Sequence, residues 1–506
     1  MDPQAETLAF LGRAATHGGA RPQRVDTHIS AVFLAGDRAW KLKRAVRLPF
    51  LDFSTVEQRH AACAAELAVN AAAAPDLYLG VVPVTRGEDG HLAIGGAGTV
   101  VDWLVEMRRF DQRTLFSRLA AGQGLDRHRI HALTEAVWRF HRAAAVRPDK
   151  GGVAGLTWTI DTNAATMAGL PDFIPPARAR DLAEASRTAL ARLAPLLEAR
   201  RAEGRVRRCH GDLHLGNICL FQGRPTLFDA IEFSEDIGCI DVFYDLAFLL
   251  MDLDRRGRRG LASTAMNHYL DLSGDYGAVA LLPLFLSLRA AIRAHVAATT
   301  AAAATAAPRR DELAAEATRY LDSAFAYLSP PPPRLLAVGG LSGSGKSRMG
   351  RELAPFLAVP GAIVVRSDAL RKQLMGADLL APLGPEGYTP EITERTYQAL
   401  YDTCRQVLAA GHAAVADAVF ARPDQREAIE RVARQSGLPF DGLWLETPPH
   451  LAARRIKGRR ANASDATVAV LKRQLDYDLG PIAWTRINTG GSKAKALADG
   501  RAAIGV

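Results

Sequence analysis

Hydrophobic and polar positions follow strand-like and helix-like patterns in the first part of the chain. Residues 31–34 and 38–46 are strand-like runs on either side of the polar pair Gly36-Asp37, and this pattern predicts a hairpin. Ser54-Thr-Val-Glu57 has the pattern of a capping box, and the Ala-rich residues after it predict a helix to about Ala74. The first part of the chain is therefore expected to combine strands with a helix that follows them.

Three short apolar runs enclose a polar segment further along the chain. Residues 206–209, 218–221 and 226–228 are predicted strands. The polar segment between the first two holds a His and an Asp that could form a solvated surface turn. Strands on both sides favour a built site instead.

Strands and helices alternate in the second half of the chain. Residues 335–338, 362–366, 413–416 and 442–446 are short apolar runs separated by helix-like stretches. This alternation is typical of βαβ units, so it predicts an α/β domain with a mostly parallel sheet.

Four consecutive prolines mark the clearest boundary in the chain. They follow Ser329, and they can form neither a helix nor a central strand. Residues 329–334 are therefore predicted to be a short, stiff linker between a domain of residues 1–328 and a domain of residues 335–506. A chain of 506 residues is also too long for a single hydrophobic core.

The composition is that of a globular protein without membrane spans, with 48% hydrophobic and 23% charged residues. The longest apolar run, residues 278–288, contains Pro283 and is too short to cross a bilayer. The first residues lack the basic start and apolar run of a signal peptide. The five cysteines show no C-x-x-C spacing and no disulfide framework. We therefore expect a soluble, cytoplasmic protein, whose oligomeric state the sequence leaves open.

Two acids and an amide near the middle of the chain are the kinds of group that phosphoryl transfer requires. Asn217 lies five residues after Asp212, and Asp229 follows twelve residues later. Transfer from ATP needs a carboxylate that accepts the proton of the attacking hydroxyl, and oxygen ligands for Mg²⁺. Asp212 is therefore the candidate base, and Asn217 and Asp229 are the candidate metal ligands.

The predicted hairpin and the helix after it supply two further candidates. Lys41 and Lys43 share one face of their strand. A kinase needs a strand lysine on the α- and β-phosphates of ATP, and Lys43, which follows an apolar Leu, is the better candidate. Lys41 is then a solvated neighbour, although both could be ordinary edge-strand lysines. Glu66 lies in the helix, where it could pair with the strand lysine or simply face solvent.

The motif His210-Gly-Asp-x-His-x-x-Asn217 resembles the catalytic loop of the aminoglycoside phosphotransferase and choline kinase branch of the protein-kinase fold. The resemblance implies an α+β, two-lobed, kinase-like domain over residues 1–328 that uses Mg-ATP. It also implies that Asp245, in a following helix, braces the catalytic loop. The metal motif reads Asp-Ala-Ile-Glu rather than the family's shorter Asp-Trp-Glu, so Glu232 is expected to support the site rather than bind the metal.

A glycine-rich loop follows the predicted strand at 335–338 and precedes a helix that is expected to end at Leu357. This context identifies the pattern G-x-x-x-x-G-K-S as a P-loop. Its glycines let backbone N–H groups surround phosphate, its lysine reaches the β- and γ-phosphates, and its last hydroxyl binds Mg²⁺. The candidate nucleotide-binding residues are Gly340, Ser342, Gly343, Ser344, Gly345, Lys346 and Ser347, and Ser347 is also a candidate metal ligand.

Acidic residues follow the next two predicted strands of this domain. Asp368 and Asp417 could be ordinary strand-end acids, but the domain resembles P-loop kinases such as gluconate kinase, chloramphenicol phosphotransferase and polynucleotide 5′-kinase. The resemblance implies that Asp368 accepts the proton of the acceptor hydroxyl and that Asp417 contacts Mg²⁺. It also implies that Arg455 and Arg460, on a basic helix, close over the γ-phosphate.

The order of the two domains resembles bacterial fusions of an aminoglycoside phosphotransferase-like domain with a P-loop, AAA-family ATP-binding domain. We therefore expect an ATP- and Mg²⁺-dependent kinase that transfers the γ-phosphate to a hydroxyl of a small-molecule acceptor. Two alternatives stay open, namely a regulatory protein with one silent ATP site and a kinase for nucleic-acid 5′-hydroxyls. The net charge of +9 suits nucleic acid as well as nucleotides, but a polynucleotide partner is not favoured because the chain has no dense basic tail. The sequence does not identify the acceptor.

Overall fold

The structure is a computed structural model that describes residues 4–27, 29–48, 51–71, 73–458 and 463–506. By its packing, the chain divides into two compact units. One consists of Met1–Trp158 and Ala194–Leu249, and the other of Thr159–Leu193 and Leu250–Val506. The second unit thus contains helices that precede the proline segment as well as everything that follows it.

An antiparallel sheet forms the first part of the first unit. The predicted hairpin is confirmed, because the strand that ends at Ala35 pairs with the strand that begins at Arg38. All neighbouring strands in this sheet run antiparallel. Within the described residues the strand order is β1 (Gln23–Asp26), β2 (Ser30–Ala35), β3 (Arg38–Lys43), β8 (Thr99–Arg108), β6 (Tyr78–Arg86) and β7 (Leu92–Ile94).

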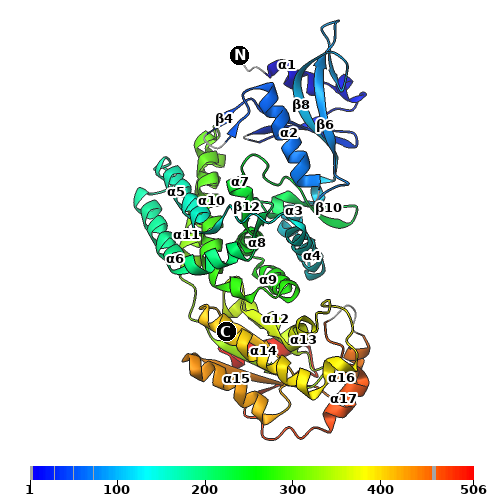
Figure 1. Cartoon of the computed structure of the whole chain (residues 1–506), viewed down its shortest axis with the longest axis vertical. Helices are drawn as coiled ribbons and strands as arrows, with labels where there is room; N and C mark the ends of the chain where they lie inside the picture. Colours follow the sequence, from blue (N-terminus) through cyan, green and yellow to red (C-terminus); the bar gives the residue numbers. More distant parts are fainter. Residues whose placement is uncertain (1–3, 28, 49–50, 72, 459–462) are drawn as a thin grey trace. The chain divides into compact units, whose positions relative to one another are not determined.

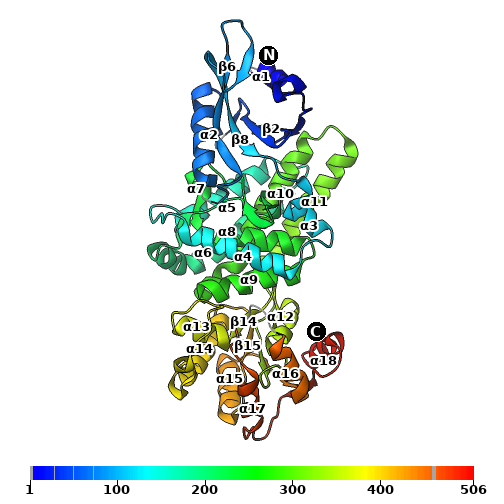
Figure 2. The ribbon, with the colours of Figure 1, turned by 90° about the vertical axis from the view of Figure 1, so that its right-hand side faces the viewer.

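Helices cover both faces of this sheet. Figures 1 and 2 show helix α2 (Val56–Ala71) on one side of the sheet and α1 (Ala5–Leu11) on the other. Cys63 and Leu67 of α2 pack against one face, and Leu11 of α1 packs against the other. The cap of α2 lies one residue later than predicted. Thr55 and Gln58 exchange the capping bonds, because the Thr55 N–H donates to Gln58 Oε1 at 3.0 Å and the Gln58 N–H donates to Thr55 Oγ1 at 3.2 Å.

Short strands and turns follow the sheet in the first unit, and they enclose the polar segment noted in the sequence. The strands predicted there are confirmed as β9 (Val206–Arg208), β10 (Ile218–Phe221) and β11 (Arg224–Leu227). β10 and β11 form a hairpin, and β9 pairs with β12 (Cys239–Asp241).

A parallel sheet forms the second part of the second unit. Its order within the described residues is β14 (Ile363–Arg366), β15 (Ala414–Asp417), β13 (Leu335–Gly339), β16 (Phe440–Glu446) and β17 (Thr485–Asn488). Helices α12 (Lys346–Leu357) and α18 (Lys493–Ala503) pack on one face. Figure 2 shows α13 (Ser367–Leu374), α14 (Pro390–Ala409) and α15 (Pro423–Ser436) on the other face. The predicted fold class is confirmed, with an α+β domain followed by an α/β domain.

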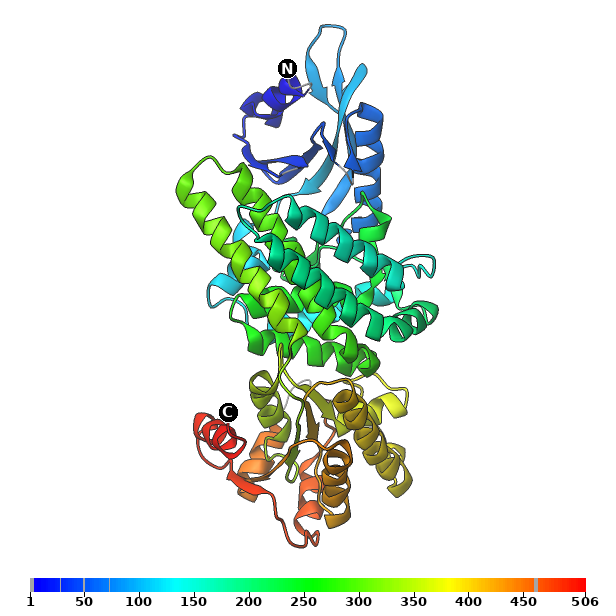
Figure 3. The ribbon, with the colours of Figure 1, turned by 90° about the vertical axis from the view of Figure 1, so that its left-hand side faces the viewer.

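Helices that precede the proline segment complete the second unit. Helices α10 (Leu282–Ala303) and α11 (Ala307–Leu328) run side by side, and Figure 3 shows the pair in light green. The apolar run at residues 278–288 was predicted to be too short to cross a bilayer. It belongs to a longer helical stretch, Tyr276–Ala303, with a mean hydropathy of 1.5. Within the most apolar 18 residues of that stretch, 72% is buried inside the protein. Such burial is typical of a core helix.

We expect the ion pair between Arg59 and Asp102 to be a main support of the first sheet. Arg59 donates to both carboxylate oxygens of Asp102, at 2.8 and 3.0 Å, and both side chains are buried. Asp102→Ala should lower the free energy of unfolding by about 3–5 kcal/mol in urea titrations, because it leaves the buried guanidinium unpaired. The exposed pair between Glu6 and Arg86 is the control, and Glu6→Ala should change stability little. Equal losses in the two variants would contradict this role of Asp102.

Candidate functional site

The structure brings the predicted base and one predicted metal ligand into direct contact. Asn217 ends the short turn η3 (Leu215–Asn217), and its side-chain amide donates to Asp212 Oδ2 at 2.9 Å and to the Asp212 backbone oxygen at 3.0 Å. His214 Nε2 lies 3.4 Å from the same carboxylate oxygen. The Asp212 side chain keeps 36% of its surface exposed, so a substrate hydroxyl can reach it.

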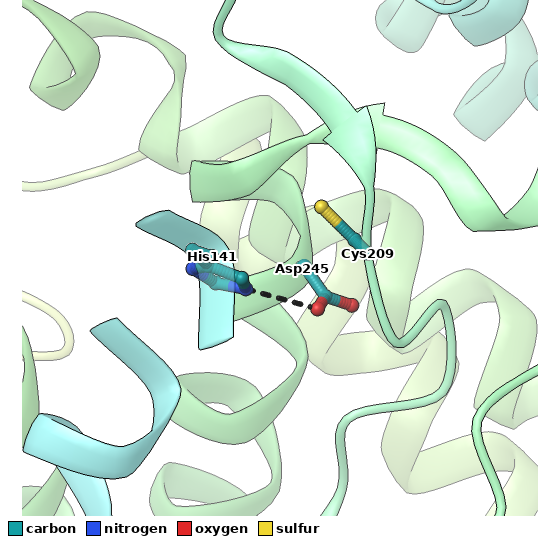
Figure 4. A group of neighbouring side chains, drawn as sticks. All are labelled: His141, Cys209 and Asp245. Atoms are coloured by element: carbon teal, nitrogen blue, oxygen red, sulfur yellow. Dashed lines mark hydrogen bonds and ion pairs between the residues drawn. The ribbon is translucent and has the colours of Figure 1, made fainter. Parts of the chain in front are cut away.

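A buried acid holds this loop from behind. Asp245, in α8 (Val242–Arg255), accepts hydrogen bonds from the backbone N–H groups of His210 and Gly211 at 3.1 and 3.0 Å. His141, in α4 (Arg127–Ala143), places Nε2 3.1 Å from Asp245 Oδ2. Figure 4 shows this contact as a dashed line. Gly211 has a φ of +81°, which few other residues adopt. The bracing role that the family resemblance implied for Asp245 agrees with these contacts.

The same acid belongs to a group with metal-ligand chemistry. The ligand atoms of His141, Cys209 and Asp245 lie within 4.8 Å of one another, and all three residues are buried (Figure 4). Both oxygens of Asp245 already accept hydrogen bonds from the loop backbone. The group is therefore better explained as a brace for the loop than as a metal centre.

Asp229, the second predicted metal ligand, stands in an uncommon backbone conformation. Its φ is +62°, which costs a non-glycine residue about 1–3 kcal/mol and persists only where the surroundings impose it. Its backbone N–H donates to the Tyr78 hydroxyl at 3.0 Å, and its carboxylate forms an ion pair with Lys41. The side chain is 42% exposed, so one side of the carboxylate remains open to a ligand.

Two lysines and a glutamate connect Asp229 to the antiparallel sheet. Glu66 of α2 accepts from Lys41 Nζ at 2.8 Å through Oε1, and it pairs with Lys43 Nζ at 2.5 Å through Oε2. Lys43 also forms an ion pair with Glu232. Burial alone would raise the pKa of Glu66, but the two ammonium groups outweigh burial and lower it to about 2. Glu66 is therefore a charged, buried residue rather than a solvated one.

The geometry distinguishes the two strand lysines and favours Lys41 over the predicted Lys43. Lys43 is fully buried between Glu66 and Glu232, whereas Lys41 reaches from Glu66 to the exposed carboxylate of Asp229. The sequence predicts a solvated Lys41, yet its side chain is only 9% exposed. The signal for Lys41 was present in Ala39-Trp-Lys41, which has the A-x-K spacing of the kinase strand motif. Glu232 contacts Lys43, as expected of a supporting residue.

The second unit contains a cavity of about 1270 Å³ lined by the loop after β13 and by residues at the ends of β14 and β15. Ligands of open α/β sheets bind at such carboxyl ends. The predicted residues that line it are Ser342, Gly343, Ser344, Gly345, Lys346, Ser347, Asp368, Asp417 and Arg455. Of the ten described site residues predicted in this domain, the structure therefore brings nine to one cavity, and Gly340 lies at the base of the loop instead.

The loop can take its shape only because glycines occupy its tightest positions. Gly340 has a φ of +136°, and a Cβ there would lie 2.6 Å from the Leu445 carbonyl oxygen. Gly343 has a φ of +84°, and a Cβ there would lie 2.6 Å from the Ala452 carbonyl oxygen. A loop of this kind directs its backbone N–H groups toward the ligand side, where α12 begins.

The basic helix predicted over the γ-phosphate is present as α16 (Pro449–Lys457). Arg455 donates to the Thr489 carbonyl oxygen at 2.6 Å and lies 3.4 Å from the Gly343 carbonyl oxygen. It therefore holds the loop as well as lining the cavity. Arg460, the other predicted anchor, lies outside the described residues. Sequence reasoning missed Tyr388, which lines the cavity beneath the Arg371 guanidinium at 4.9 Å from the ring centre.

Comparison with known families identifies two domains in the chain. Residues 28–282 match the model of the phosphotransferase enzyme family, which is half of the chain. The chain belongs to the phosphotransferase enzyme family. Residues 335–478 match a second model, described as an AAA domain. The predicted combination of the two domains in one chain is confirmed, and it assigns a kinase-like phosphotransfer function with nucleotide use.

Similar proteins cover both parts of the chain. The uncharacterized protein Rv2004c of Mycobacterium tuberculosis (strain ATCC 25618 / H37Rv) is 29% identical over 487 residues, which is 93% of each chain. A choline/ethanolamine kinase family protein from Mesorhizobium loti covers 63% of this chain and 98% of its own, at 16% identity and a TM-score of 0.39. A gluconokinase from Sinorhizobium meliloti 1021 covers 34% of this chain and 92% of its own, at 20% identity and a TM-score of 0.26.

The brace formed by Asp245 can be tested without any substrate. In Asp245→Asn the amide nitrogen cannot accept one of the two backbone N–H bonds, so the amides of His210 and Gly211 should exchange with solvent faster. Hydrogen exchange of peptides that cover residues 205–217 measures this change. Asp236→Asn, which alters only an exposed pair with Lys150, is the control. Unchanged exchange in Asp245→Asn would show that the loop does not depend on this acid.

Proposed function

We propose that the chain carries two Mg-ATP-dependent phosphotransfer sites, each of which moves a γ-phosphate to a hydroxyl of a small-molecule acceptor. The observation that carries the proposal is the contact between Asp212 and Asn217 at 2.9 Å, in a unit that also joins Lys41, Glu66 and Asp229 by ion pairs. A base, an amide and a lysine–acid chain are the groups that kinases use for positioning and charge neutralisation.

In the first site each residue has a role that its contacts support. Asp212 would accept the proton of the acceptor hydroxyl, since its carboxylate is partly exposed and oriented by Asn217. Lys41 would hold the ATP phosphates and Glu66 would hold Lys41, because the buried Glu66 carboxylate fixes the ammonium group. Magnesium, when bound, would neutralise phosphate charge.

The candidate metal ligands of the first site fit magnesium. Asn217 uses its amide nitrogen on Asp212, so its side-chain oxygen is the atom directed to other ligands. Asp229 supplies a half-exposed carboxylate from a constrained backbone position. Magnesium prefers carboxylate and carbonyl oxygens of this kind and keeps several waters.

In the second site Lys346 would contact the ATP phosphates and Asp368 would activate the acceptor hydroxyl. Ser347 and Asp417 would hold magnesium, and these oxygen donors line the same cavity as the glycine loop, which supports the fit. Its volume of about 1270 Å³ exceeds the roughly 300–1,000 Å³ of ordinary ligand pockets, which leaves room for an acceptor beside the nucleotide.

Single-site variants of the full chain test whether both sites transfer phosphate. Asp212→Asn should lower phosphorylation by the first site about 10²–10⁴-fold, because the general base is lost, while Lys346→Ala should remove the contribution of the second site. Transfer from γ-labelled ATP to a panel of metabolites and to an oligonucleotide with a 5′-hydroxyl measures both effects. The control is Asp236→Asn. Full transfer in Asp212→Asn would assign the first site a regulatory role, and salt-sensitive labelling of the oligonucleotide would replace the small-molecule acceptor with nucleic acid.

Parallel substitutions at the two strand lysines test which of them holds the nucleotide. Lys41→Met should raise the KM for ATP about tenfold or more, because a charged phosphate contact is lost. Lys43→Met should instead lower the free energy of unfolding by about 3–5 kcal/mol, because it leaves Glu66 and Glu232 buried without their shared cation. Initial-rate kinetics and urea titrations measure the two effects. The reverse assignment of effects would restore Lys43 as the phosphate lysine.

A further inference from the structure

Helix α9 (Arg259–Ser273) precedes the proline segment in sequence, yet it lies along the edge of the parallel sheet (Figure 2). β14 is the edge strand on that side. A Cβ on Gly361, just before the strand, would lie 2.3 Å from Ser263 Oγ, so the two backbones approach closely. An uncovered edge strand exposes unpaired backbone groups, and covering it with a helix is one of the ways in which proteins protect such an edge.

Three residues of α9, spaced four apart, meet the strand in succession. Ser263 faces Gly361. Asn267 accepts from the Val364 N–H at 2.6 Å and donates to the Ala362 carbonyl oxygen at 3.1 Å. Asp271 then meets the last residue of the strand. Four helical residues advance about 6.0 Å and two strand residues about 6.6 Å, so the two elements stay in step along this length.

The last of these contacts ends beside a candidate metal ligand of the second site. Asp271 Oδ2 accepts from Arg366 Nη1 at 2.9 Å, and Arg366 Nε lies 3.8 Å from Asp417 Oδ2. All three side chains are buried, with exposed fractions between 4% and 7%. Burial would lower the pKa of Arg366, but Asp271, Asp417 and Asp368 together raise it, so the guanidinium stays charged.

The same end of α9 also holds the segment that carries the candidate base. Gln373, in α13, donates to the Asp271 carbonyl oxygen at 3.0 Å. Asp368 lies in the first turn of α13, directly after β14. Asp271 therefore contacts, through its side chain and its backbone, both the end of β14 and the helix that begins there.

We propose that Asp271 is a positioning residue of the P-loop site. It keeps the Arg366 guanidinium 3.8 Å from Asp417, beyond a direct hydrogen bond, and so leaves that carboxylate available to magnesium. The inference rests on the proposed function of this site. A buried guanidinium needs a carboxylate partner. Without the Asp271 charge, the nearest one on the neighbouring strand is Asp417, and a direct bond to it would compete with the metal.

The test measures how much magnesium the full chain needs to bind a fluorescent ATP analogue, mant-ATP. The signal of Lys346→Ala is subtracted, so that only binding at the P-loop remains. Asp271→Asn should raise the magnesium concentration at half-saturation roughly ten- to hundredfold, because the competing bond joins two charged groups. Asp254→Asn is the matched control. Asp254 is a buried acid that pairs with Arg259 at the other end of α9 and with the Tyr327 hydroxyl, so its loss should not move the magnesium requirement.

A second substitution distinguishes competition by Arg366 from general loosening. The double variant Asp271→Asn/Arg366→Met removes the competing cation and should return the magnesium requirement close to that of the unaltered chain. The inference would be overturned if the magnesium requirement stayed high in the double variant. It would also be overturned if Asp254→Asn raised the magnesium requirement as much as Asp271→Asn does. If Asp271→Asn does not fold, Asp271→Glu keeps the charge but moves the guanidinium toward Asp417, and an unchanged requirement would overturn the inference equally.

Failure of the proposed function gives a different result. If Lys346→Ala removes no mant-ATP binding at any magnesium concentration, the loop after β13 does not bind nucleotide and the inference falls with the proposed function. If a Lys346-dependent signal exists and Asp271→Asn does not alter its magnesium dependence, the positioning role alone is wrong.

Discussion

Burial of charged carboxylates, each surrounded by its own donors, is the constraint on which both candidate sites depend. A carboxylate out of water is stable only when cations or N–H groups replace its hydration. Glu66 meets this condition with two lysines, and Asp245 meets it with two backbone N–H groups and His141. Asp271 meets it with Arg366. Each of these acids fixes the position of its partners, because leaving any partner unpaired would cost several kcal/mol.

The constraint also separates supporting residues from reactive ones. Glu66, Asp245 and Asp271 are buried and paired with cations or N–H groups, whereas Asp212 and Asp229 keep 36% and 42% of their side chains exposed. The exposed acids are therefore the ones that substrate or metal can reach. The buried acids form a rigid inner layer, and the exposed acids form an accessible outer layer. Catalysis by positioning and electrostatics requires this arrangement, because the reactive groups must be held in place before the substrate arrives.

The sequence was sufficient where a motif determines its own local geometry. The P-loop needs left-handed glycines at set positions between a strand and a helix, and those residues are adjacent in the chain, so the loop after β13 could be predicted together with its ends. The contact between Asp212 and Asn217 is of the same kind, because the two residues are only five positions apart in one loop. The alternation of strands and helices likewise predicted the parallel sheet, whose pairings follow from the βαβ connections.

Contacts between distant segments could not be predicted in the same way. Lys41 and Lys43 share a face, and only the position of α2 and of the segment after β11 decides which lysine meets Asp229. The pair between Asp271 and Arg366 joins residues 95 positions apart, and neither lies in a recognisable motif. The cap of α2 moved by one residue because Ser54 and Thr55 are both good caps, and the side chain of Gln58 selects between them.

The edge of the parallel sheet explains why the proline segment is a boundary in the sequence but not in the packing. The prolines stop regular structure at 329–334, but β14 needs its outer edge covered, and α9 supplies that cover through Asn267. A chain that began at Leu335 would expose the Val364 N–H and the Ala362 carbonyl oxygen, and it would remove Asp271, the ion-pair partner of Arg366. The fold of the second site therefore depends on residues from both sides of the linker.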